Sequence, residues 1–208
     1  MNFKRTLTPN QKMNLLLVLM TAFCFFLSVF RVIESGTPYF LFLNWNLFLA
    51  IVPYLLTASI SSQKRGRIQR LKIIGVSMVW LLFFPNAPYI LTDLFHLRIE
   101  TSVPKWFDLI LIISFAWTGL LFGFLSLMKI EKLYTNFFTK RQVEWLSSSI
   151  LFLASFGVYL GRYLRWNSWD VVNNPSSLLF DISDRVINPF EHPRTWGVTI
   201  LFGILLNI

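Results

Sequence analysis

The residues of this chain that could perform chemistry include a carboxylate and an imidazole placed three residues apart. Asp93 and His96 would project from one face of a helix. Such a pair could carry out acid–base chemistry, or it could bind a metal ion with Asp108 or Asp170 as a further ligand. A hydrogen bond between the two side chains explains the spacing more simply. We therefore expect no metal site and no cofactor.

Two arginines, Arg162 and Arg165, are also three residues apart. The planar guanidinium group suits phosphate and carboxylate, so this pair could hold a lipid phosphate or a phosphorylated substrate. The same side chains could instead extend to lipid headgroups or form ion pairs with Asp93, Asp108 or Asp170. Because Arg162 lies about one turn inside the end of an apolar run, it needs a partner, and a structural ion pair is the default interpretation.

Asparagines near these residues could orient an anionic group through hydrogen bonds. The candidate ligand-binding residues are Asn44, Asn46, Asn86, Asp108, Arg162, Arg165, Asn167 and Asp170, and the candidate catalytic residues are Asp93 and His96. The sequence contains no Gly-x-Ser-x-Gly nucleophile turn, no Gly-rich phosphate loop and no Cys–His pairing. Whether the protein is an enzyme therefore stays open.

Long apolar segments must position these side chains. Only 14% of the 208 residues are charged and 55% are hydrophobic, whereas about 25% of a soluble domain is charged. So few charges cannot cover a water-facing surface, which implies contact with lipid. A spanning helix needs about 20 mostly apolar residues. The sequence predicts an all-α polytopic membrane helix bundle, one integral membrane domain over 1–208, with about six spans at 13–30, 39–61, 73–91, 106–128, 145–164 and 196–208.

The loops between these segments differ in positive charge. Counted in alternate loops, twelve Lys and Arg lie on the side of the N-terminus and seven on the other side. Cytoplasmic loops are richer in Lys and Arg, so we expect a cytoplasmic N-terminus in a bacterial plasma membrane and a candidate site on the outer side. The net charge of +9 lies in short loops and not in a basic arm. This distribution favours contact with anionic lipid over nucleic acid.

Two features concern how the segments pack. Pro85 and Pro88 remove backbone donors, so the third segment should break near its outer end, either to bind a ligand or as a kink stabilised by Asn86. Glycines four residues apart, which let helices approach closely, occur in the fourth and fifth segments. These glycines are Gly119 and Gly123, and Gly157 and Gly161.

The outer segment 167–195 should contain a short helix. Asn174 and Pro175 form a plausible N-cap and first-turn pair. Leu179, Ile182 and Val186 then recur at helical spacing. This helix would lie on the outer membrane interface or, alternatively, cover the bundle. The last apolar segment, 196–208, is short, and whether it spans fully stays open.

Three motifs together resemble a known family. They are NWNLFLA with PY at 44–54, FPNAPYILTDL with HL at 84–97, and GRYLRWNSWD at 161–170. In combination they are similar to the bacterial multi-pass membrane proteins catalogued as domain of unknown function 1361, over the chain from about Leu43 to its end. The resemblance implies a bacterial integral membrane protein. It supplies no catalytic residues, because the family has no established activity.

The functional hypothesis is a polar pocket for the headgroup of an envelope lipid or a lipid-linked precursor. Arg162 and Arg165 would hold the anionic group, and the asparagines would orient it. One alternative is a structural or assembly partner of other membrane proteins. Others are a lipid-acting enzyme and a small-solute transporter. Mid-membrane positions are mostly Leu, Phe and Ile, which counts against transport.

Overall fold

The structure is a computed structural model, and it describes residues 8–60, 67–98 and 103–208. These residues form helices joined by turns, with no β-strand, so the prediction of an all-α fold is confirmed. The helices are α1 (Pro9–Ser35), α2 (Phe42–Ala58), α3 (Arg67–Phe83), α4 (Asn86–Tyr89), the 3₁₀ helix η1 (Ile90–Arg98), α5 (Lys105–Tyr134), α6 (Lys140–Leu164), α7 (Asp170–Asn173), α8 (Pro175–Ile187) and α9 (Pro193–Asn207). Of the cations counted above, Lys4, Arg5, Lys64 and Arg65 lie outside the described residues.

Two of the long helices, α1 and α6, begin with capping boxes. Thr8 and Gln11 exchange side-chain and backbone hydrogen bonds at the start of α1, and Thr139 and Gln142 do so at the start of α6. Each box satisfies two backbone N–H groups that have no partner inside the helix. Gly36 ends α1 in the left-handed conformation with a φ of 64°, which glycine adopts without a steric penalty.

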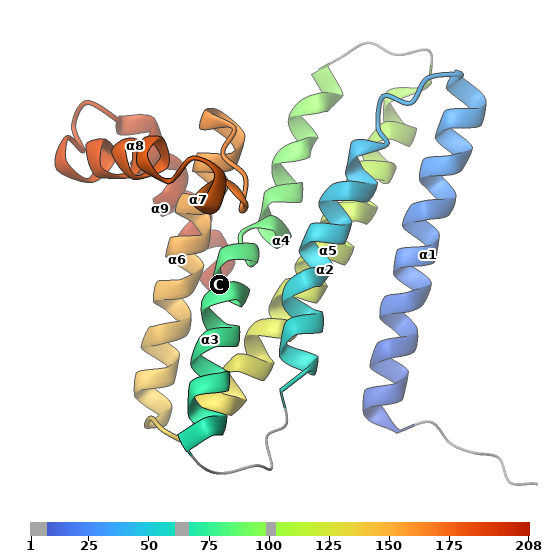
Figure 1. The fold of residues 1–208 in the computed structure, drawn as a ribbon. Coiled ribbons are helices and arrows are strands. Elements are labelled where there is room, and N and C mark those ends of the chain that lie inside the picture. The colour runs from blue at the N-terminus through green and yellow to red at the C-terminus, as the bar shows by residue number, and fades with distance from the viewer. Residues whose placement is uncertain (1–7, 61–66, 99–102) are drawn as a thin grey trace, which may run out of the picture.

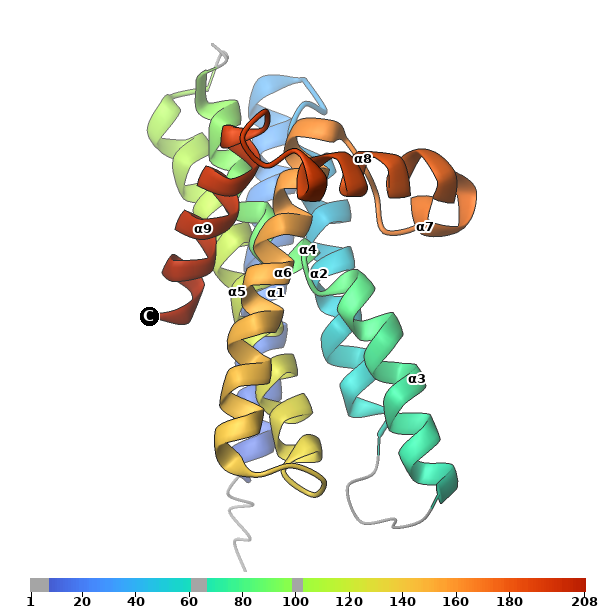
Figure 2. The same cartoon turned by 90° about the vertical axis from the view of Figure 1, so that its left-hand side faces the viewer.

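Helix α5 lies in the middle of the bundle and contacts α1, α2, α4, η1 and α6 (Figure 1). Buried apolar residues of α5 such as Leu111, Ile112 and Phe115 form a core with Leu43 and Leu47 of α2. The start of α1, the start of α3 and the turn between α5 and α6 lie together at one end of the molecule (Figures 1 and 2). The short helices α7 and α8 lie near the opposite end, crosswise to α6.

Four segments are long and apolar enough to cross a membrane, judged by length and composition: Pro9–Ser35, Ile68–Arg98, Lys105–Tyr134 and Lys140–Leu164. Helix α2 is apolar but has 17 residues, and α9 has 15. Helix α9 runs back along α6 and reaches Ser148, whose hydroxyl donates to Oδ1 of Asn207 at 2.7 Å. Among the described residues, four of the about six predicted spans therefore have the length of a crossing helix.

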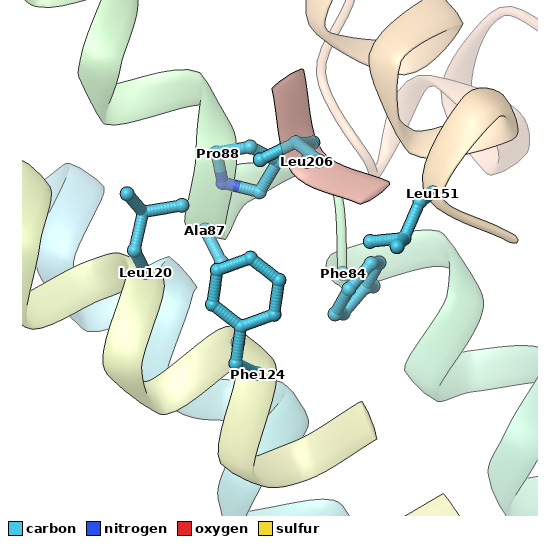
Figure 3. A pocket seen from close by; sticks show the side chains of 8 residues that line it. Phe84, Ala87, Pro88, Leu120, Phe124, Leu151 and Leu206 are labelled. Atoms are coloured by element: carbon cyan, nitrogen blue, oxygen red, sulfur yellow. The ribbon is translucent and has the colours of Figure 1, made fainter. Parts of the chain in front are cut away.

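The third apolar segment breaks where the prolines predicted. Helix α3 ends at Phe83, and the chain continues after a turn through α4 and η1. Side chains from the break, α5, α6 and α9 converge beside this point (Figure 3). The apolar cavity that they leave has a volume of about 10 Å³. That is barely the volume that one water needs, so this contact is a packing interface and not a ligand site.

Small residues let the break approach its neighbours. A Cβ atom on Gly157 would lie 2.8 Å from the ring of Pro85, and one on Gly123 would lie 2.7 Å from the Cβ of Ala87. Both distances are shorter than a carbon–carbon contact allows. The glycine spacings in α5 and α6 therefore mark close contacts with the broken segment, as their pattern indicated.

We expect Gly157→Ala to lower the stability of the protein by about 1–3 kcal/mol, because the added methyl group overpacks the contact with Pro85. The matched control is Gly75→Ala in α3, where nothing lies within 4 Å of the added Cβ. That variant should unfold at the wild-type temperature or slightly above it, since alanine favours the helix. Thermal unfolding in detergent measures both. Equal midpoints for the two variants would contradict the packing described here.

Candidate functional site: a cleft beside the broken helix

Polar side chains form hydrogen bonds with the backbone at the break in the third segment. Because α3 stops at Phe83, backbone carbonyl groups near its end lack helical partners. Nδ2 of Asn86 donates to the carbonyl oxygen of Phe83 at 2.8 Å and to Oγ of Ser168 at 3.1 Å. The hydroxyl of Ser168 donates to the carbonyl oxygen of Leu82 at 3.0 Å. Asn86 therefore stabilises the kink, and the segment after α6 is tied to the end of α3.

Beyond the break, Asp93 forms a buried ion pair with Arg162 of α6. Only 1% of the Asp93 side chain is exposed. Nδ2 of Asn46 donates to its other oxygen at 2.8 Å, and Nε of Arg162 donates to Oγ1 of Thr92 at 2.7 Å. The Arg162 guanidinium also lies 4.7 Å from the centre of the Tyr89 ring. The carboxylate thus has a charged partner and an amide partner, as a buried charge requires.

His96 is oriented by the backbone of the same segment. Its Nδ1 lies 3.1 Å from the carbonyl oxygen of Asp93 and 3.9 Å from the carboxylate. A carbonyl oxygen only accepts, so a neutral imidazole carries its proton on Nδ1. The predicted interaction of Asp93 and His96 is therefore made mainly through the backbone, while the Asp93 carboxylate is committed to Arg162.

A cleft of about 700 Å³ opens beside this ion pair, between α2, the break, α6 and the α7–α8 segment. Its polar lining residues are Asn46, Asn86, His96, Arg162, Arg165, Asn167 and Ser168. Its apolar lining includes Leu81, Leu82, Leu153, Phe156 and Leu160. Leu153 precedes Arg162 on α6 by nine residues, about 14 Å along the axis. The cleft is therefore apolar toward the start of α6 and polar toward its C-terminal end.

Arg165 differs from Arg162 in conformation and in partners. It ends α6 with a φ of 62°, in the left-handed position that glycine usually occupies. That conformation costs a residue with a side chain about 1–2 kcal/mol. The side chain of Arg165 makes no hydrogen bond and no ion pair with the described residues, and it is exposed and lines the cleft. The guanidinium is a cation available to a ligand.

Helix α8 forms the outer wall of the cleft through Leu178 and Ile182. Polar contacts hold it on the bundle: Nε1 of Trp166 donates to Asp181 at 2.8 Å, and Nε1 of Trp196 donates to the carbonyl oxygen of Arg185 at 3.1 Å. At the end of α8, hydrogen bonds from Asn188 and His192 lower the pKa of Asp184. Asn174 and Pro175 stand at the predicted start of α8, but the Asn174 side chain makes no capping hydrogen bond.

Five of the candidate ligand-binding residues line the cleft, namely Asn46, Asn86, Arg162, Arg165 and Asn167, together with His96. Asn44 lies outside it, since its Nδ2 donates to Oγ of Ser28 on α1 at 2.8 Å. Asp170 is near the cleft but accepts from the backbone N–H of Asn167 at 2.7 Å, so it shapes the turn after α6.

Asp108 also lies outside the cleft lining. Its carboxylate is 3.1 Å from Nε of Arg31, in a second buried ion pair that joins α5 to α1. Arg31 is 1% exposed, donates to Ser35 and Thr37, and packs on the ring of Phe40. The sequence reasoning had not paired these two residues. The available signal was a lone cation at the end of the first apolar run and a lone acid at the start of the fourth.

The described residues contain no group of three His, Cys, Asp or Glu side chains that could hold a metal ion. The cation that pairs with Asp93, beside His96, is the guanidinium group of Arg162. Three further residues of the site were not among the candidates: Tyr89, Thr92 and Ser168. Their side chains support the ion pair and the break.

The apolar helices and the buried ion pairs between them indicate a membrane protein with an amphipathic cleft near one end. Residues 45–208 match the family described as a protein of unknown function, DUF1361. The chain therefore belongs to this family, as its three motifs predicted. No curated protein and no solved structure matches the chain.

We expect Asp93→Asn to destabilise the protein by about 3–5 kcal/mol, because it leaves the Arg162 guanidinium without its counter-charge. The double variant Asp93→Asn/Arg162→Gln should lose less than the sum of the two single variants. Thermal unfolding in detergent gives all three values. Lys140→Gln is the control, since its pair with Glu144 is 3.7 Å long and exposed, and should change stability by no more than about 1 kcal/mol. Strictly additive losses would contradict a direct pair.

Proposed function

We propose that this protein is a multi-pass protein of the bacterial cytoplasmic membrane that binds the anionic headgroup of an envelope lipid or a lipid-linked precursor. The observation that carries the proposal is the guanidinium group of Arg165, which has no side-chain partner among the described residues and lines a cleft with an apolar wall. An amphiphile has the matching order of groups, with an anionic headgroup at the membrane surface and apolar chains below it. A ligand without an apolar tail would leave the apolar side chains of the cleft, such as Leu153 and Phe156, uncovered.

The placement of the cleft at the outer surface rests on charge and on helix arrangement. The starts of α1 and α3 and the turn between α5 and α6 lie at the end of the bundle opposite α8 (Figures 1 and 2). The cations of these segments include Lys12, Arg70, Lys72, Lys129, Lys132, Lys140 and Arg141. Loops rich in Lys and Arg stay in the cytoplasm. The N-terminus is then cytoplasmic, and the cleft faces the outer leaflet.

Helix α8 supports the same placement. Leu179, Phe180, Val186 and Ile187 are exposed on one side of it, while Asp181 and Asp184 occupy the other. Such a helix lies in the headgroup region with its apolar side toward the acyl chains. We count α1, α2, the α3–η1 segment, α5 and α6 as crossing segments, with α9 as a shorter sixth. At about 26 Å, α2 is shorter than the hydrocarbon core of about 30 Å, and it packs along α5.

The second candidate is a structural or assembly role, favoured by one observation. Asp93 and Arg162 pair with each other, and Asn86 and Ser168 donate to backbone carbonyl oxygens at the break. These residues therefore hold the broken segment in place, whatever binds beside them. Arg165 distinguishes the two candidate functions, because its side chain takes no part in these interactions.

We expect Arg165→Gly to abolish retention of anionic lipid while the folded protein stays as stable as the wild type or becomes more stable by up to about 1 kcal/mol. The reason is that glycine adopts the left-handed cap without strain, whereas the cation for the headgroup is lost. Native mass spectrometry of the gently purified protein measures bound lipid, and thermal unfolding in detergent measures stability. Arg194→Gln is the control, since Arg194 lies near the same end, against the ring of Tyr163 and outside the cleft lining.

Unchanged lipid retention in Arg165→Gly, with wild-type stability, would overturn the binding proposal. A loss of stability or of a bound membrane partner without any change in lipid would favour the assembly role.

We expect an impermeant thiol reagent to label Ser183→Cys on α8 in intact cells and to miss Asn136→Cys in the turn between α5 and α6. Both positions are exposed, and the native Cys24 is buried. Asn136→Cys should become reactive once the membrane is permeabilised. The opposite labelling pattern would place the cleft on the cytoplasmic side and refute the orientation.

A further inference from the structure

We propose that the headgroup held in the cleft is a phosphate that carries hydroxyl groups, such as a glycerol or a sugar, and not a bare phosphate or an ammonium headgroup. This inference rests on the proposed function and names the chemical class of its ligand. It follows from which hydrogen-bond donors, hydrogen-bond acceptors and charged groups line the cleft.

The first step is the orientation of Asn86. Its amide nitrogen faces the carbonyl oxygen of Phe83, which can only accept a hydrogen bond. The NH₂ group must therefore lie on that side, and the amide cannot be turned round without placing two acceptors in contact. Oδ1 of Asn86 accepts no hydrogen bond from the described residues. It is not among the buried, unsatisfied atoms, and its side chain lines the cleft.

Asn46 of α2 repeats the arrangement. Its NH₂ group donates to Oδ2 of Asp93, whose other oxygen pairs with Arg162. Oδ1 of Asn46 likewise has no donor among the described residues, and this side chain also lines the cleft. By contrast, Oδ1 of Asn44, outside the cleft, is buried without a partner. The cleft therefore presents two fixed acceptors, and a ligand must supply donors to them or leave them unpaired.

The charge of the lining decides which kind of donor fits. Among the described residues, no Asp or Glu lines the cleft, whereas Arg162 and Arg165 do. Three carboxylates of the described residues contact the lining, and each already has a partner: Asp93 pairs with Arg162, Asp170 accepts from the backbone N–H of Asn167, and Asp181 accepts from Trp166. An ammonium group would meet two guanidinium groups and no carboxylate of the lining, which is unfavourable at close range. Hydroxyl groups donate without carrying charge, so they satisfy the amide oxygens beside a phosphate bound to Arg165.

An exposed aromatic surface adjoins these acceptors. Trp45 lines the cleft one residue before Asn46, stacks on Phe48 at 5.3 Å between ring centres, and lies 6.4 Å from Trp169. A flat apolar ring beside amide oxygens suits the C–H faces of a polyol or sugar, whose hydroxyl groups point to the polar side. The ligand class is thus a phosphate lipid with a hydroxylated headgroup.

The test compares lipids of equal charge that differ only in hydroxyl groups. The wild-type protein is placed in neutral phosphatidylcholine nanodiscs that contain equal fractions of phosphatidylglycerol and phosphatidylpropanol, and the retained lipid is identified by native mass spectrometry. Further discs contain phosphatidic acid, phosphatidylethanolamine or a glycosylated polyprenyl phosphate. Arg165→Gly is run beside the wild type.

We expect phosphatidylglycerol to be retained about ten-fold over phosphatidylpropanol and phosphatidic acid, because each added hydrogen bond contributes about 0.5–1.5 kcal/mol. The preference should vanish in Arg165→Gly. Stronger retention of the glycosylated polyprenyl phosphate than of phosphatidylglycerol would support the same headgroup chemistry and assign it to a lipid-linked precursor. Weaker retention would assign it to a glycerophospholipid.

Equal retention of phosphatidylglycerol and phosphatidylpropanol, with both lost in Arg165→Gly, would overturn the hydroxyl inference and leave an anionic headgroup site. A preference for phosphatidylethanolamine would also overturn it. If no lipid is retained specifically by the wild type, the proposed function itself fails.

Discussion

A carboxylate enclosed among membrane helices must be compensated, and the pairing of Asp93 with Arg162 is the interaction on which the arrangement of this protein depends. Asp93 reaches Arg162 only because the third apolar segment stops at Phe83 and continues in a different direction. The break is possible because Asn86 and Ser168 satisfy the carbonyl groups of Phe83 and Leu82. The ion pair, the hydrogen bonds to the backbone carbonyl groups and the direction of the chain after Phe83 therefore depend on one another. The cleft lies beside these residues.

The same coupling explains why polar residues of similar type have different roles. Asn46 and Arg162 are held by Asp93, and Asn86 is held by the carbonyl oxygen of Phe83 and by Ser168, so their orientation is fixed before any ligand arrives. Arg165 is held by the backbone cap of α6 and by no side chain among the described residues. Preorganised acceptors beside a guanidinium group without a side-chain partner among the described residues support the proposed binding, because little entropy is lost when the ligand is ordered. The second ion pair, Arg31 with Asp108, joins α1 to α5 and has no share in the cleft.

The sequence was sufficient for features that depend on local chemistry. Two prolines predicted the break, glycine spacing predicted the close contacts, and low charge predicted long apolar helices. It was insufficient wherever the rotation of a helix decides the outcome. Asn44 and Asn46 are about 200° apart around α2, so one faces α1 and the other Asp93. Likewise, nothing local assigns Asp108 to Arg31 and Asp93 to Arg162, or places Arg165 in a left-handed cap, since these follow from how the helices pack.

The central claim is that the cleft holds a lipid headgroup against Arg165, and a density map of the protein in a lipid bilayer tests it most directly. Single-particle electron microscopy in nanodiscs of bacterial lipid should show a strong feature within hydrogen-bonding distance of the Arg165 guanidinium, continuous with chain density along Leu82, Leu153 and Phe156. A map that resolves these side chains and shows the cleft closed, or filled with water alone, would contradict the account.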